Sequence, residues 1–141
     1  MEELSIKNKE LLFNDLCARL PYDCNVTIAE GGIDGLQWNN VTLNSYLLYQ
    51  IEEEDGLEYI KPYLRPMSSV TEEEKREIYN WLVENDIDWF DFSKLRLDEI
   101  LISFDSSWLL VDWLNKHHFD YHGLIEKGLA IAVTEENNPY K

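Results

Sequence analysis

The spacing of apolar residues changes abruptly at Pro21, and this change constrains the fold more than any other feature of the sequence. Before the proline, apolar residues recur every three or four positions between Leu12 and Leu20, which predicts an amphipathic helix. Ser5 can cap the start of this helix, and Pro21 ends it because proline has no N–H group. After the proline, apolar and polar residues alternate over 24–28, which predicts a half-buried strand. The chain therefore begins as a helix followed by a sheet.

The glycine-rich stretch E-G-G-I-D-G after this strand predicts a turn, because glycine adopts positive φ angles without strain. We expect a short second strand at 36–38, a turn at Asn39–Asn40 and a third strand over 41–51. Residues 52–56 read as a charged turn, and the two prolines within 61–69 favour an extended backbone there. Together these segments predict a small antiparallel sheet.

A helix over about 72–84 has the strongest local signal in the chain. Ser69 with Glu72 and Thr71 with Glu74 both have the spacing of a capping box, in which two side chains satisfy backbone groups at a helix start. Acidic side chains in the first turn also favour a helix, because they lie at the positive end of its dipole.

The rest of the chain gives weaker signals. Segment 85–105 fits a strand or a helix equally well. A serine at 106 or 107 can cap the helix that follows, and a short helical turn over 122–129 ends at Gly128, a glycine suited to the left-handed position after a helix. We expect the polar tail 134–141 to be loose.

These elements predict a single α+β domain over residues 1–141, with a small antiparallel sheet following an N-terminal helix and packed against the later helices. The sequence has no basic-then-apolar leader and no run of eighteen apolar residues, so we expect a cytoplasmic protein without a membrane segment. Cys17 and Cys24 are seven positions apart and form no C-x-x-C pair. We expect both to be reduced, buried thiols.

The net charge is −16, from 28 acidic and 12 basic residues. Direct binding of nucleic acid needs clustered Lys and Arg to neutralise phosphates, and the sequence has no such cluster. The same negative charge opposes docking on anionic lipid and attracts basic protein surfaces. A basic protein surface is therefore the expected partner.

The stretch from Glu52 to Asp91 holds thirteen acidic and four basic residues, interleaved with aromatic side chains. Acids beside aromatic anchors suit binding to a basic protein surface. The candidate binding residues are Glu52, Glu53, Glu54, Asp55, Glu58, Glu72, Glu73, Asp86, Asp88 and Trp89. A solvated face that only keeps the protein soluble is the competing interpretation.

All three histidines lie within six positions, at 117, 118 and 122. His118 and His122 would share a face if they lay on one helix, as two metal ligands must. Gly123 and the neighbouring aromatic residues predict a break between helices instead. We therefore favour a packing role, with the charge of His117 and His118 stabilising a helix end, and we predict no metal or cofactor. A metal-binding protein or metal-assisted hydrolase using His118 and His122 is the alternative.

Catalytic motifs are missing from the sequence, which has no G-x-S-x-G, glycine-rich phosphate loop or H-E-x-x-H. The serines are accounted for as helix caps, so we favour a protein that is not an enzyme. A purely structural homo-oligomer is a third alternative, with Trp108 and Trp113 as candidate interface residues.

Three blocks of the chain resemble a family of small proteins, without an assigned activity, from gut-dwelling anaerobic bacteria and their phages and mobile elements. The blocks are L-C-A-R-L-P-Y at 16–22, K-P-Y-L-R-P-M-S-S-V-T-E-E-E at 61–74 and D-W-L-N-K-H-H-F-D-Y-H-G-L-I-E-K-G-L-A at 112–130. The resemblance implies no cofactor or site residue. The chain departs from the family wording at His122, where the family has arginine, which weighs against a metal role for that residue.

The resemblance implies an accessory factor of a phage or mobile element. Together with the charge, it leads us to predict a non-enzymatic, acidic protein-binding factor. In its sharper form this factor is a mimic of nucleic acid that occupies a basic protein surface.

Overall fold

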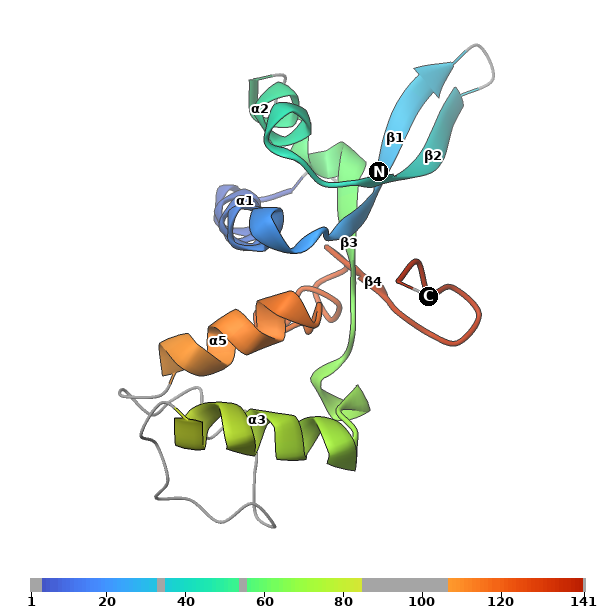
Figure 1. Cartoon of the computed structure of the whole chain (residues 1–141). Coiled ribbons are helices and arrows are strands. Elements are labelled where there is room, and N and C mark those ends of the chain that lie inside the picture. Colours follow the sequence, from blue (N-terminus) through green and yellow to red (C-terminus); the bar gives the residue numbers. More distant parts are fainter. Residues whose placement is uncertain (1–3, 33–34, 54–55, 85–106, 141) are drawn as a thin grey trace.

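The computed structural model describes residues 4–32, 35–53, 56–84 and 107–140, and Figure 1 shows how their helices and strands are arranged. The α+β class is confirmed, because an N-terminal helix precedes a four-stranded sheet and further helices lie between the strands along the chain. The elements are α1 (Ile6–Arg19), η1 (Leu20–Tyr22), β1 (Asn25–Gly32), β2 (Gly35–Thr42), α2 (Ser45–Glu53), η2 (Leu57–Tyr59), β3 (Ile60–Leu64), η3 (Met67–Ser69), α3 (Glu72–Glu84), α5 (Ser107–Lys116) and β4 (Ile131–Ala132). Within the described ranges, no helix is long and apolar enough to cross a membrane. Segment 85–105, the serine cap at 106 and the centre of the predicted glycine turn at 33–34 lie outside the described residues.

Helix α1 begins and ends as predicted. The Ser5 hydroxyl accepts a hydrogen bond from the Asn8 N–H at 3.1 Å, and the helix gives way at Leu20 to the short 3₁₀ turn η1, which contains Pro21. The prediction for the cysteines was half right. Cys24 is buried, but Cys17 is exposed, because the buried stripe of α1 runs through Leu12, Asp15, Leu16 and Arg19 and Cys17 lies outside it.

The sheet has the order β2–β1–β3–β4. β1 pairs antiparallel with β2 over eight consecutive residue pairs and antiparallel with β3, as predicted for a small antiparallel sheet. β4 differs from that prediction because it pairs parallel with β3. The predicted turn at Asn39–Asn40 is wrong, since both residues continue β2 as partners of β1.

The predicted third strand over 41–51 is also wrong, because residues 45–53 form helix α2. Asn44 explains the difference. Its side-chain oxygen accepts a hydrogen bond from the Leu47 N–H at 2.8 Å, and this cap starts a helix directly after β2. Leu48 then points into the core, with Leu47 and Ile51 packed beside it. Glu52 and Glu53, the first two residues of the predicted charged turn, instead end α2, and the next two residues lie outside the described ranges.

Helix α3 confirms the predicted boundaries 72–84 and one of the two predicted caps. The Glu74 N–H donates to the Thr71 hydroxyl at 3.1 Å, and the Thr71 N–H donates to the Glu74 carboxylate at 3.0 Å. Ser69 does not cap this helix, because its hydroxyl donates instead to the Pro66 carbonyl at 2.7 Å.

The C-terminal segment is folded back onto the sheet rather than loose. A single turn at 124–128 ends at Gly128, whose φ of 72° confirms the predicted left-handed glycine. Beyond β4, the Tyr140 hydroxyl donates to the Tyr63 carbonyl at 2.8 Å and accepts from the Asn25 N–H at 2.9 Å. The tail is thus attached to both β1 and β3.

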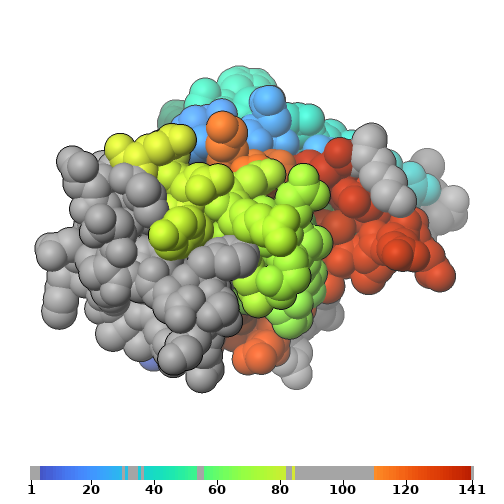
Figure 2. All heavy atoms as spheres, turned by 60° about the horizontal axis from the view of Figure 1, so that its bottom comes forward, coloured from blue at the N-terminus to red at the C-terminus, as the bar shows by residue number. Residues whose placement is uncertain are grey.

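Among the described residues, two hydrophobic clusters make up the core. The first lies among α1, α2 and the sheet, and its buried residues are Leu12, Leu16, Cys24, Val26, Leu43, Leu48, Leu57, Ile60, Leu64, Leu124, Leu129 and Ala130. The second joins α3 to α5 through Ile78, Leu110, Trp113, Leu114 and Phe119. Figure 2 shows the end of the molecule that carries α3, with the C-terminal segment beside it. Trp113 is a core residue, which removes it from the predicted oligomer interface, and the Trp108 side chain lies outside the described residues.

The segment after Ile60 connects the two clusters. Leu64 lies in the first cluster and accepts a hydrogen bond from the Val133 N–H at 2.8 Å. Arg65 lies over the Phe119 ring of the second cluster, 4.1 Å from its centroid, and its guanidinium donates to both carboxylate oxygens of Glu74 at 2.6 and 2.7 Å. One short stretch of chain therefore contacts both halves of the core.

Candidate functional site

The histidine segment begins where α5 ends. The His118 N–H donates to the Asn115 carbonyl at 3.1 Å, and the Phe119 N–H donates to the Leu114 carbonyl at 2.9 Å. This pair of bonds is a Schellman motif with His118 in the left-handed position, at φ 65°. The predicted break is confirmed, so His118 and His122 do not share a helix face.

The predicted packing role of these histidines is confirmed, but the predicted charge role is not. The His118 ring stacks on the Tyr140 ring at a centroid distance of 3.7 Å, and His117 stacks on Trp113 at 4.0 Å. Burial, with a smaller contribution from nearby Arg19, lowers the pKa of His118 to about 4, and burial also lowers the pKa of His117. Both rings are therefore mainly uncharged near pH 7, and they stabilise the helix end through stacking.

His122 belongs to a buried polar cluster that includes two residues of α1. Its Nδ1 lies 2.7 Å from Asp15 Oδ2, and the Asp15 carboxylate also accepts from Arg19 Nε at 2.5 Å and Nη2 at 3.1 Å. Arg19 Nη2 donates in addition to the Phe119 carbonyl at 2.7 Å. The Arg19 guanidinium lies 5.1 Å from the Tyr121 ring centroid. The cluster ties α1 to the segment that follows α5.

The ionisation of this cluster follows from opposing effects. Burial alone would raise the pKa of Asp15, but the hydrogen bonds from His122 and Arg19 outweigh it and lower the pKa. Burial would likewise lower the pKa of Arg19, and Asp15 more than compensates. Both groups thus stay charged in the interior. Two Arg19 nitrogens donate to the Asp15 carboxylate and His122 contacts it, which is the arrangement of a structural ion pair.

The alternative metal site would need carboxylates beside the histidines. Asp120, the carboxylate between them, accepts from the Leu124 N–H at 2.9 Å and the Ile125 N–H at 3.0 Å, and so starts the following turn. In the part of the chain that the structure describes, no group of three His, Cys, Asp or Glu side chains is placed to hold a metal ion.

The described members of the predicted acidic set fall into two groups. Glu52 and Glu53 end α2, with Glu58 nearby in η2, 3.7 Å from the Lys9 ammonium. Glu72 and Glu73 begin α3, which Figure 1 shows at the opposite end of the molecule from α2. Glu54, Asp55, Asp86, Asp88 and Trp89 lie outside the described residues. The five described acids do not form one continuous face.

Helix α2 carries the most exposed aromatic side chains of the described residues. Tyr46 is 69% exposed and Tyr49 is 62% exposed. These two tyrosines, Gln50 and Glu53 are spaced so that they share one side of the helix, and all four are exposed. The Gln50 amide donates to the Tyr46 hydroxyl at 3.1 Å. We call these four residues, with the adjacent exposed Glu52, the α2 face.

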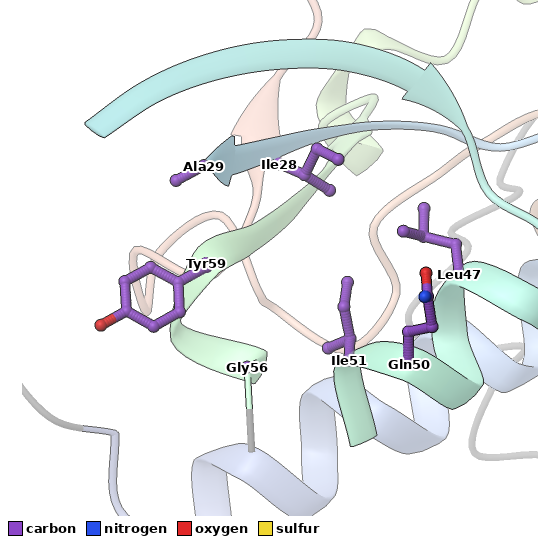
Figure 3. Close-up of a pocket in the computed structure, with 7 residues that line it drawn as sticks. All are labelled: Ile28, Ala29, Leu47, Gln50, Ile51, Gly56 and Tyr59. Atoms are coloured by element: carbon purple, nitrogen blue, oxygen red, sulfur yellow. The ribbon is translucent and has the colours of Figure 1, made fainter. Parts of the chain in front are cut away.

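A pocket of about 210 Å³ lies beside the α2 face, between β1 and α2. Figure 3 shows Ile28 of β1 opposite Leu47 and Ile51 of α2, with the Tyr59 ring at one side. Gln50 belongs to both the pocket lining and the α2 face, so the two are continuous. This site was missed from the sequence because, in the strand predicted over 41–51, Tyr46 and Tyr49 would lie on opposite faces. The signal that could have revealed it is Asn44, a good N-cap three residues before Leu47.

Comparison with known proteins does not add to this geometry. No family model matches the chain, and no curated protein or solved structure shows significant similarity to it.

Proposed function

We propose that the chain is an acidic protein-binding module whose α2 face binds a Lys- or Arg-rich segment of another protein. The observation that carries this proposal is the pairing of two largely exposed tyrosines with two glutamates at the C-terminal end of the same helix. Tyrosine is among the residues that contribute most at protein interfaces, and the net charge of −16 favours a basic partner.

The two groups of acids lie at opposite ends of their helices. Glu72 and Glu73 lie in the first turn of α3, where a negative charge stabilises the helix dipole. Glu52 and Glu53 lie in the last turn of α2, where the dipole is negative, and no basic residue accompanies them there. Each such charge costs a surface helix about 0.3–1 kcal/mol. Helix stability therefore accounts for the acids of α3 and leaves those of α2 to be explained by binding.

The pocket beside the α2 face extends the proposed interface. A basic segment lying along α2 would place its charged groups near Glu52 and Glu53 and an apolar side chain over the pocket. Exposed charges steer association and set its salt dependence, whereas aromatic anchors in a desolvated contact supply most of the affinity. Loss of either tyrosine should thus weaken binding more than loss of either charge.

Fluorescence anisotropy with a labelled peptide of Lys, Arg and Leu tests this proposal. We expect binding that weakens strongly between about 50 and 300 mM salt, since exposed charges are screened over roughly 10 Å at 0.1 M. Tyr46→Ala with Tyr49→Ala should weaken binding at least about tenfold, the effect of losing one or two interface anchors. Glu52→Gln with Glu53→Gln should weaken it about threefold or more, as expected for partly screened charges.

The matched control changes the same net charge at the other end of the molecule. Glu72→Gln with Glu73→Gln should leave peptide affinity within about twofold, because those charges lie on α3, at the opposite end of the molecule from α2, and exposed charges are screened by salt. Equal losses in the two glutamine variants would show that net charge rather than the α2 face binds the peptide, and would contradict the proposal.

The nucleic-acid-mimic form of the proposal also predicts how the natural partner behaves in a pull-down. A pull-down from nuclease-treated lysate should retain a stoichiometric partner with the wild type and with the α3 control, and lose it with both α2 variants. Displacement of that partner by added duplex DNA would support mimicry. A partner that depends on the α2 face but is not displaced by DNA would support the binding module and contradict nucleic-acid mimicry.

A further inference from the structure

Strand β2 is an open edge of the sheet. The strand order β2–β1–β3–β4 leaves one side of β2 without a paired strand among the described residues. β2 is eight residues long, and its residues from Gln37 to Asn40 are all exposed. Figure 1 shows the β1–β2 hairpin extending away from the helices. The opposite edge, β4, has only two residues.

The backbone groups on that open side can be assigned from the hydrogen-bond pattern. The Leu43 N–H donates to the Cys24 carbonyl at 2.8 Å, and antiparallel pairs alternate between bonded and non-bonded residues. The odd-numbered residues of β2 therefore bond to β1. The backbone N–H and C=O groups of Leu36, Trp38, Asn40 and Thr42 point outward, where another strand can bond them.

Within the described residues, β2 itself lacks the sequence features that normally prevent strands from pairing. Proteins protect open edges with lysines, prolines, inward charges or bulges. β2 contains no charged residue and no proline, and its register with β1 is continuous over eight pairs, without a bulge. The absence of charge is notable in a chain of which 28% of residues are charged.

We propose that two copies of the chain pair through β2 in antiparallel orientation and form one continuous sheet. The charge distribution selects a second copy as the occupant. A basic peptide would find no acid on β2 to bind, whereas a second copy presents the same uncharged strand. Antiparallel pairing of the two strands therefore places no like charges opposite each other, despite the net charge of −16 on each chain. The uncharged run includes Gly35 and continues through α2 to Ile51.

The expected register is the one that pairs all four outward-facing residues of β2. Bonded pairs join even-numbered residues, so Trp38 lies opposite Asn40 of the second copy and Leu36 opposite Thr42. The two-fold axis then passes between Asn39 and Asn39 of the second copy, which form a non-bonded pair. The Asn39 side chain lies on the same face of the sheet as Ile28, its partner on β1.

Sedimentation velocity on the full chain is the first test. We expect a concentration-dependent dimer for the wild type and for Asn40→Ala. Asn40→Pro should be monomeric, because proline removes an outward N–H without removing a bond to β1. Both variants lose the 3.0 Å hydrogen bond from the Tyr63 hydroxyl to the Asn40 side chain, so a difference between the two variants cannot come from that bond. A wild type that stays monomeric at all concentrations overturns the proposal, as does a dimer that persists in Asn40→Pro.

Cysteine trapping tests the register, in a Cys17→Ser background that removes the exposed native thiol. Asn39→Cys should give a disulfide-linked dimer, since residues of a non-bonded pair have Cα atoms about 4.5 Å apart, within disulfide range. Gln37→Cys should not, because the two residues 37 would lie about 14 Å apart along the strands at 3.4 Å per residue. Equal trapping at both positions, or trapping only at 37, overturns the register and the proposal. The peptide assay on the α2 face is independent of this result.

Discussion

Replacing Asp15 by asparagine removes a charge from the buried cluster while keeping the shape of the side chain. The Asp15 and Arg19 side chains are both 0% exposed, and their contacts of 2.5 and 3.1 Å make a two-point ion pair. Breaking a buried pair by neutralising one partner leaves the other charge uncompensated and costs about 3–5 kcal/mol. Asparagine still accepts one hydrogen bond from Arg19, so we expect a loss of about 3 kcal/mol in the free energy of unfolding. For a chain of this size, that loss corresponds to a fall in Tm of roughly 10 °C.

Urea unfolding followed by tryptophan fluorescence measures this loss, and its pH dependence identifies the cause. The pKa of Asp15 is lower in the folded chain than its ordinary value. The stabilisation by the carboxylate is therefore complete above the ordinary pKa, near 4, and is lost as the pH falls through the folded pKa. The difference between wild type and Asp15→Asn should be larger at pH 5 than at pH 3.

The control for this experiment is Glu10→Gln, which removes an exposed charge from the same helix and should change stability by no more than about 0.5 kcal/mol. A loss below about 1 kcal/mol for Asp15→Asn would refute the reasoning, because it would mean that the buried Arg19 does not need a charged partner. A difference from the wild type that grows between pH 5 and pH 3 would refute the sign of the linkage.

Three further predictions can be checked by the same urea measurements. Thr71→Ala should lose about 1 kcal/mol because it removes the cap of α3, whereas Ser69→Ala should lose less than about 0.5 kcal/mol; similar losses would contradict the assignment of the cap. Gly128→Ala should lose about 1 kcal/mol because its φ is 72°, whereas Gly31→Ala, at a site without positive φ or close neighbours, should be neutral or stabilising. Tyr140→Phe should lose about 1–3 kcal/mol because two backbone groups lose their partner, and a loss under about 0.5 kcal/mol would show that the tail does not hold the sheet.

Local signals in the sequence predicted the elements whose cause is local. The capping box of Thr71 and Glu74 and the left-handed Gly128 each depend on residues within a few positions, and both were located correctly. The strand predicted over 41–51 was wrong for a physical reason. The apolar residues of this segment fit a strand and a helix about equally, and a single side-chain cap from Asn44 decides between them.

The buried cluster of Asp15, Arg19 and His122 could be predicted from the sequence only in part. Asp15 and Arg19 recur with Leu12 and Leu16 at helical spacing, so the sequence already placed two charges within an apolar stripe. What the sequence did not show is the third member, His122, which lies 107 positions further along the chain. The exposed face of α2 was missed for the simpler reason that the helix itself was missed.

The connection of both core clusters by Leu64 and Arg65 has a consequence for hydrogen exchange. The Arg65 N–H donates to the His118 carbonyl at 2.7 Å, and the Arg65 carbonyl accepts from the Asp120 N–H at 2.9 Å. If one cluster opens alone, these bonds are still held by the half that stays folded. The amide protons of Arg65, Asp120 and Val133 should therefore exchange with solvent only when the whole chain unfolds, and report its global stability directly.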